Sequence, residues 1–192
     1  MLRRLYDWTM LQAANPHALW ILAAISFIES SFFPIPPDVL LIPLVLAQRH
    51  RAFFIAGVCT VASVAGGFFG YFIGYALYET VGVAVLNFYG YLEKFTEFQG
   101  MYNDQGAWIV FFAGLTPFPY KVITIASGVT ALDPTVFGLA SIVSRGLRFF
   151  LVAALLWYWG PWIRGFIDRY FGLLTLLFFA LLFGGFALIA FL

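Results

Sequence analysis

Five charged residues stand in stretches of sequence that are otherwise apolar, and they are the first candidates for chemistry. They are Glu29, Asp38, Lys121, Arg145 and Arg148. A charge at the centre of a membrane helix costs roughly 2.5–3.5 kcal/mol to insert, so each needs a partner or a polar cavity. Arginine binds carboxylate and phosphate oxygens with the same planar fork. Carboxyl groups shielded from water can carry protons.

These residues allow two interpretations. In the first, they pair internally, Asp38 with Lys121 and Glu29 with an arginine, and only hold the chain together. The five charges sum to +1, however, so complete pairing leaves one cation over. We therefore favour the second interpretation, in which all five line a cavity that binds an anionic headgroup and protons.

The sequence contains no enzyme or metal signature. His17 and His50 are isolated, and a single cysteine, Cys59, excludes both a disulfide framework and a cysteine metal site. The net charge of +1 provides no basic stripe for nucleic acid. We expect no enzymatic activity, no cofactor, no metal and no nucleic-acid partner.

The composition is that of a membrane protein. Of 192 residues, 63% are hydrophobic and only 10% are charged, against about 25% charged in soluble domains. The predicted fold is an all-α polytopic membrane protein with one transmembrane domain over residues 18–159. Residues 1–17 are expected to form an amphipathic interfacial segment, and residues 160–192 a linker and a C-terminal transmembrane helix.

A proline motif occurs twice, and it must position the charges. The motif around Pro34, Pro36, Pro37 and Asp38 returns 83 positions later around Pro117, Pro119 and Lys121. Proline breaks helices, and broken backbone at membrane depth survives only where protein or a watery cavity covers it. We therefore predict two re-entrant hairpins, at about 18–47 and 107–131, with these prolines at their tips.

Each predicted hairpin is followed by a full span, at about 52–78 and 135–159. In the first span Ala62, Gly66, Gly70 and Gly74 recur every fourth residue, a pattern that lets another helix approach closely. In the second, Arg145 and Arg148 share one helix face and point toward the hairpin tips. The polar stretch 79–106 is predicted to be a separate helix along the membrane surface.

Counting charges orients the chain. With both hairpins re-entrant, six basic residues share one side: Arg3, Arg4, Arg49, Arg51, Arg164 and Arg169. The other side keeps one basic residue, Lys94, beside five acidic residues: Glu79, Glu93, Glu97, Asp104 and Asp133. The positive-inside rule then predicts a multi-pass protein of the cytoplasmic (inner) membrane, with its N-terminus in the cytoplasm and its C-terminus outside. The two halves would form an inverted repeat, as in many transporters.

Three segments together resemble the DedA superfamily of VTT-domain membrane proteins, and most closely its YqaA-like branch. They are Glu29 with the motif 34–38, the stretch TPFPYKVITIASG at 116–128, and SRGLRFFLVA at 144–153. The resemblance covers about residues 20–155. It implies an inverted pair of re-entrant hairpins and a role in lipid translocation, of undecaprenyl phosphate in bacteria or of phospholipids in eukaryotic relatives.

The resemblance also implies which residues act. Glu29, Asp38, Lys121 and Arg145 match the family's functional positions. Many members carry an arginine after the glycine that precedes the second proline motif, whereas Gly114 is followed here by Leu115, and Arg148 is the candidate replacement. We thus expect a transporter of an anionic lipid, with protons as a second ligand. A proton or cation antiporter, a non-transporting membrane-integrity protein, and homo-oligomer formation all stay open.

Overall fold

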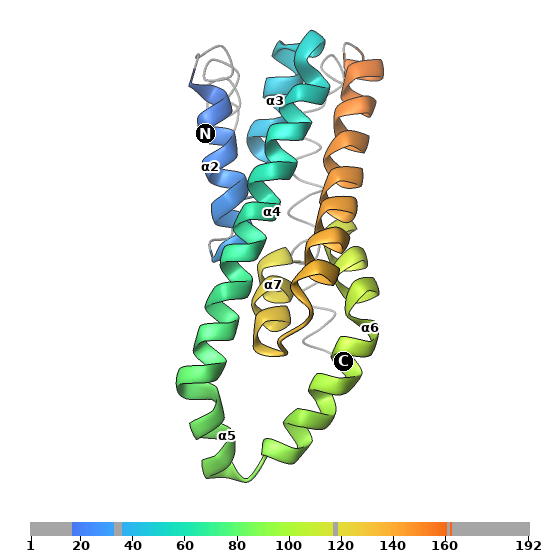
Figure 1. Cartoon of the computed structure of the whole chain (residues 1–192). Helices are drawn as coiled ribbons and strands as arrows, with labels where there is room; N and C mark the ends of the chain where they lie inside the picture. Colours follow the sequence, from blue (N-terminus) through green and yellow to red (C-terminus); the bar gives the residue numbers. More distant parts are fainter. Residues whose placement is uncertain (1–16, 33–35, 117–118, 161, 163–192) are drawn as a thin grey trace, which may run out of the picture.

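The computed structural model describes residues 17–32, 36–116, 119–160 and 162. Every regular element within these ranges is a helix (Figure 1). The predicted N-terminal interfacial segment, the C-terminal transmembrane helix, and the tip residues Pro34 and Pro117 lie outside the described residues.

The first half of the chain forms short helices before a long one. These elements are α2 (Ala18–Ser31), α3 (Asp38–Ala47), the 3₁₀ turn η1 (Arg49–Arg51) and α4 (Ala52–Leu77). Pro36 and Pro37 directly precede α3, where the missing proline N–H costs no helical hydrogen bond. The limbs predicted on either side of the first proline motif, and the span predicted at 52–78, are therefore helical as expected.

The second half has the same order, two helices before a long one, and it is preceded by the π-helical turn η2 (Tyr78–Gly82) and the short helix α5 (Val83–Tyr89). Its elements are α6 (Leu92–Leu115), α7 (Tyr120–Val129) and a long helix, Pro134–Gly160. Pro119 directly precedes α7, just as Pro37 precedes α3. The long helix agrees with the span predicted at 135–159.

The prediction of a separate polar helix over 79–106 is wrong. The α4 helix continues through η2 and α5 to Tyr89, and the chain reverses at Gly90, whose φ of 68° suits glycine. The α6 helix then runs unbroken from Leu92 to Leu115, so the limb predicted to begin at residue 107 begins 15 residues earlier. The predicted boundary rested on a change in polarity, which by itself does not end a helix.

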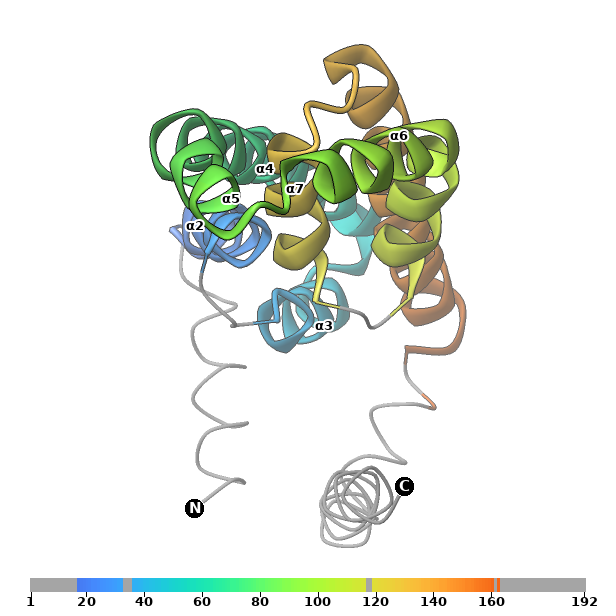
Figure 2. The ribbon, with the colours of Figure 1, turned by 90° about the horizontal axis from the view of Figure 1, so that it is seen from below.

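Helix α4 is the central helix of the fold (Figures 1 and 2). Both α2 and α7 pack against its row of small residues, Ala62, Gly66, Gly70 and Gly74. A Cβ on Gly66 would lie 2.1 Å from the Phe27 carbonyl oxygen of α2. A Cβ on Gly74 would lie 2.0 Å from the Ile125 carbonyl oxygen of α7. The prediction that this row lets another helix approach closely is confirmed, because only glycine lets these backbones come so close.

Two apolar cores lie at opposite ends of the bundle. One joins α2, α3, the start of α4 and the last turns of helix Pro134–Gly160, around Leu22, Leu44 and Phe149. The other joins α6, α7 and the start of the same long helix, around Val110 and Phe137. The charged residues singled out in the sequence lie between these cores.

Two helical segments of the described chain are long and apolar enough to cross a membrane. They are Arg49–Tyr89, with 41 residues, and Pro134–Gly160, with 27. Large apolar side chains on both are exposed, among them Val61 and Phe72 on one and Leu139 and Leu151 on the other. These properties are compatible with a membrane protein.

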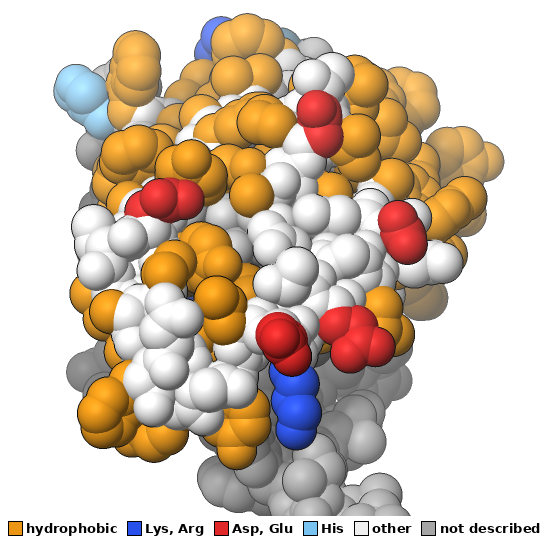
Figure 3. Space-filling model, turned by 60° about the horizontal axis from the view of Figure 1, so that its bottom comes forward, with side chains coloured by type: hydrophobic (Ala, Val, Ile, Leu, Met, Phe, Trp, Pro, Cys, Tyr) orange, Lys and Arg blue, Asp and Glu red, His pale blue; other side chains and the backbone are white. Residues whose placement is uncertain are grey.

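Charge is distributed unevenly along the bundle. Acidic side chains are spread over the half of the bundle that holds η2, α5 and α6, called the acidic end below (Figure 3); they are Glu79, Glu93, Glu97, Asp104 and Asp133. Arg49 and Arg51 lie at the opposite end of the bundle, directly before the first residue of α4. At the acidic end Asp133 caps helix Pro134–Gly160, accepting the backbone N–H groups of Thr135 and Val136 at 2.8 and 3.0 Å. These two hydrogen bonds lower the pKa of the Asp133 carboxyl below its ordinary value of 3.8.

Candidate functional site

Arg145 is the largest fully buried side chain of the described structure, with 1% of its surface exposed. Its Nη2 lies 3.1 Å from Oε2 of Glu29, and its Nε donates to Oγ of Ser63 at 2.7 Å. The guanidinium carbon lies 4.9 Å from the ring centre of Tyr120 and 4.6 Å from that of Phe149. Arg145 is therefore paired, hydrogen-bonded and covered by two aromatic rings.

Two serines close a ring around this ion pair. Oγ of Ser63 lies 2.7 Å from Oγ of Ser30, which in turn donates to Oε2 of Glu29 at 3.2 Å. The ring Glu29–Arg145–Ser63–Ser30 thus joins α2, α4 and helix Pro134–Gly160. Hydrogen bonds of this kind make a buried ion pair tolerable, since desolvating two charges is expensive.

Arg148 forms the second ion pair, and this pair is more accessible. Its Nη2 lies 2.8 Å from Oδ2 of Asp38, and the two side chains keep 22% and 23% of their surface exposed. Its Nη1 donates to the carbonyl oxygen of Thr116 at 3.1 Å. Asp38 opens α3, where a carboxylate favours the helix N-terminus, and Thr116 follows the last residue of α6. Arg148 therefore links the two proline-flanked breaks of the chain.

The two ion pairs and the two serines form a polar layer across the bundle: Glu29, Ser30, Asp38, Ser63, Arg145 and Arg148. Further hydroxyl groups extend this layer. Tyr120 donates its hydroxyl to Oγ of Ser141, and Thr124 of α7 donates to the carbonyl oxygen of Ser30 at 3.1 Å. The residues predicted from the sequence did not include Ser30, Ser63 or Tyr120. Their signal was present, because hydroxyl groups within apolar helices need partners when buried.

The sequence predictions for the five charges have mixed outcomes. The prediction that Glu29 would pair with an arginine, among the internal pairs considered, is confirmed, and both arginines do face the hairpin helices. The prediction that Asp38 would pair with Lys121 is wrong, since the carboxylate of Asp38 binds Arg148. That prediction rested on equivalent positions in two copies of a motif, and equivalent positions in a repeat need not touch. Lys121 is half-buried in the first turn of α7.

The described residues contain no group of three or more histidine, cysteine, aspartate or glutamate side chains that could hold a metal ion. Cys59 is buried in the first core, close to Ser26. Both carboxylates of the polar layer face arginine. The layer therefore presents the chemistry of ion pairs and hydroxyl groups.

Comparison with known proteins reveals relatives of similar length. An uncharacterized protein of Haemophilus influenzae is 40% identical over 152 residues, which are 79% of this chain and 78% of that protein. An uncharacterized protein of Histophilus somni is 38% identical over 151 residues, with coverage of 79% and 78%. No family model and no solved structure matches the chain. At this identity and coverage, the chain belongs to the same protein family as the Haemophilus influenzae and Histophilus somni proteins.

Proposed function

We propose that the protein is an integral membrane transporter of the DedA type that translocates an anionic lipid between leaflets. The lipid is a polyprenyl phosphate or a phospholipid, and its passage is coupled to protons. The observation that carries the proposal is the contrast between two ion pairs in one polar layer. In one pair Arg145 is fully buried and Glu29 is 16% exposed, whereas in the other pair Arg148 and Asp38 are 22% and 23% exposed.

The order of the helices supports the transporter architecture. In each half a helix leads to a proline motif, a ten-residue helix (α3 or α7) and a long apolar helix. The two long helices run in opposite directions, and so do α3 and α7 (Figure 1). In a membrane this arrangement corresponds to two re-entrant hairpins that enter from opposite faces, with the breaks of the helices near the midplane.

Arg148 is the residue best suited to receive a headgroup. The oxygen atoms of a phosphate can accept hydrogen bonds from the Arg148 guanidinium, as the Asp38 carboxylate does. The two anions therefore compete for one site. A phosphate that binds Arg148 thus displaces the carboxylate of Asp38. Lys121, half-buried at the start of α7, supplies a second positive charge to the layer between the hairpins.

Arg145 and Glu29 have a different role in this proposal. Their ring with Ser30 and Ser63 holds α2, α4 and the second long helix in place while the outer pair opens. A headgroup that displaced Glu29 from Arg145 would leave a carboxylate buried without a cation, at high cost. We therefore assign exchange of partners to Asp38 and Arg148 alone.

The proposal is tested by leaflet exchange of a fluorescent phosphatidic acid in liposomes that contain the purified protein. The wild-type protein is expected to accelerate exchange, and Arg148→Gln and Asp38→Asn to lose most of that acceleration. Lys94→Gln is the matched control, because it removes an exposed basic side chain at the acidic end, far from the polar layer. Exchange that is unchanged in Arg148→Gln contradicts the proposal.

The same liposomes separate the alternatives. A proton or cation antiporter would collapse a pH gradient without added anionic lipid and lose that activity in Asp38→Asn. A non-transporting protein would show neither lipid exchange nor gradient collapse. The internal pairing of four of the five charges is the observation that favours this last alternative.

A further inference from the structure

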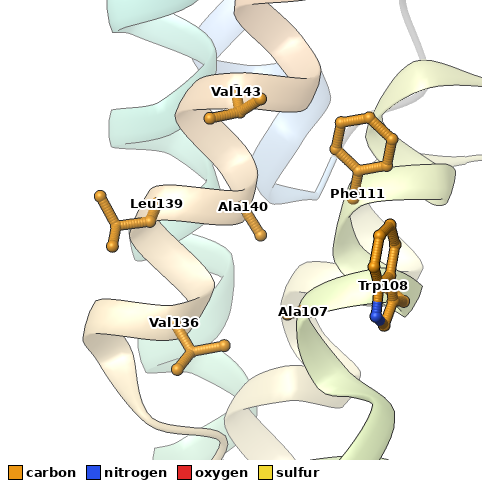
Figure 4. Close-up of a pocket in the computed structure, with 7 residues that line it drawn as sticks. All are labelled: Ala107, Trp108, Phe111, Val136, Leu139, Ala140 and Val143. Carbon is orange, nitrogen blue, oxygen red and sulfur yellow. The ribbon is translucent and has the colours of Figure 1, made fainter.

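We propose that an apolar groove between α6 and helix Pro134–Gly160 holds the hydrocarbon chain of the anionic lipid whose headgroup meets Arg148. This inference rests on the proposed function and names the part of the lipid that the polar layer cannot bind. The groove has a volume of about 550 Å³ (Figure 4). It is lined by seven apolar residues: Ala107, Trp108, Phe111, Val136, Leu139, Ala140 and Val143.

The groove exists because the two helices touch on either side of it and separate in between. A Cβ on Gly106 would lie 2.4 Å from Cδ1 of Leu132, just before the long helix begins. A Cβ on Gly114 would lie 2.3 Å from Oγ of Ser144. Trp108 stands between these two contacts and leaves a gap against the opposite helix (Figure 4). The gap therefore lies between two close contacts of α6, one with Leu132 and one with the long helix.

The lining favours a hydrocarbon chain over another protein helix. Helices that associate within lipid do so through small residues that let their backbones approach. Most of this groove is instead lined by aromatic and branched side chains, and Trp108 and Leu139 are 62% and 60% exposed. The walls carry almost no polar surface for hydrogen bonds. Its volume lies within the roughly 300–1,000 Å³ of small-molecule sites.

Both walls of the groove lead to the accessible ion pair. Arg148 follows Val143 by five residues, and Thr116 follows Phe111 by five, a rise of about 7.5 Å along each helix axis. These two continuations meet where Nη1 of Arg148 donates to the carbonyl oxygen of Thr116 at 3.1 Å. A positive charge therefore lies just beyond the Gly114–Ser144 contact that closes this end of the apolar groove, and a lipid with an anionic headgroup has the complementary charge.

Trp108 provides a direct reporter of the occupant. In a single-tryptophan variant that keeps Trp108, with the other tryptophans changed to phenylalanine, bromine on a bound acyl chain quenches its fluorescence. The variant is placed in phosphatidylcholine nanodiscs and titrated with phosphatidic acid brominated on its chains, or with phosphatidylcholine brominated in the same way. We expect quenching by the phosphatidic acid to saturate at a several-fold lower mole fraction.

The matched control keeps Trp20 instead, which is 77% exposed on α2 and outside the groove. Trp20 is expected to be quenched equally by the two brominated lipids. Arg148→Gln should remove the preference of Trp108 for phosphatidic acid. Ala107→Phe should reduce the saturable quenching by filling the groove from its exposed rim, whereas Ala65→Phe, at an exposed position of α4, should not.

Equal quenching of Trp108 by the two lipids overturns the inference. So does saturable quenching that persists in both Arg148→Gln and Ala107→Phe. Failure of the proposed function has a different signature, namely saturable quenching of Trp108 in a protein that does not accelerate leaflet exchange. Conversely, normal leaflet exchange together with equal quenching of Trp108 by the two lipids would support the proposed transporter and contradict a role for the groove.

Discussion

At the scale of single residues, two arginines three positions apart have opposite environments. Arg145 is sealed by Glu29, Ser63 and two aromatic rings, whereas Arg148 keeps about a fifth of its surface exposed. In the proposed mechanism the same side-chain chemistry therefore supports a structural clamp in one case and an exchangeable anion site in the other. Burial, not residue type, separates the two roles.

The clamp role of Arg145 predicts strong coupling with Glu29. Arg145→Met or Glu29→Leu alone leaves an unpaired buried charge and should destabilise the protein by about 3–5 kcal/mol. The double variant removes both charges and should recover most of that loss. The measurement is the thermal unfolding midpoint of the protein in detergent. Additive losses in the double variant would contradict the coupling, because they would mean that the two charges do not act as a pair.

At the scale of elements, the glycine row on α4 decides how closely the broken helices approach. The α2 and α7 helices meet the same face of α4, and glycine replaces side chains where backbones touch. Because the Ser30 carbonyl and Thr124 lie together over Gly70, this packing also aligns α2 with α7. The polar layer depends on that alignment, since it includes Ser30 of α2 as well as Tyr120 and Thr124 of α7.

Gly74→Ala tests this packing. The new Cβ would lie 2.0 Å from a backbone oxygen of α7, which cannot move aside without separating the helices, so we expect a lower unfolding midpoint. The control is Gly100→Ala on α6, where nothing lies within 4 Å of the added Cβ. There alanine should stabilise the helix by up to about 1 kcal/mol. Equal shifts of the unfolding midpoint in the two variants would show that the close contact at Gly74 does not contribute to stability.

At the scale of the whole molecule, charge orients the bundle. The acidic end and the end near Arg49 and Arg51 are separated by the full length of α4, which has 26 residues and hence spans about 39 Å. That length exceeds the hydrocarbon thickness of about 30 Å. Under the proposed membrane topology the acidic end lies outside the cell and the arginines face the cytoplasm.

Cysteine labelling checks this orientation. In a Cys59→Ser background, Glu97→Cys should react with a membrane-impermeant maleimide on spheroplasts. His50→Cys should react only after the membrane is permeabilised, because it lies between the two arginines of η1. Both positions are exposed in the fold, so differences in reactivity report the side of the membrane. Labelling of both from the same side would contradict the topology.

Much of the local structure was predictable from particular residues. Pro37 and Pro119 mark the starts of α3 and α7, and the uninterrupted apolar run after Arg51 becomes α4. The continuity of α6 was not predictable in the same way, because the polar stretch before Ala107 continues directly into an apolar one. Periodicity and composition report which face of a helix is apolar, and they place a helix end poorly when no proline or glycine marks it.

The sequence by itself determined that the chain is helical, that apolar segments such as 52–78 and 135–159 are long enough to cross a membrane, and that five charges lie within apolar surroundings. Only the tertiary structure decided which charges meet. Glu29 and Arg145 are 116 residues apart, and Asp38 and Arg148 are 110 apart. Partners at such separations are chosen by how α2, α3 and the last long helix pack. Complementary charge alone would have allowed either arginine, or Lys121, to bind Asp38.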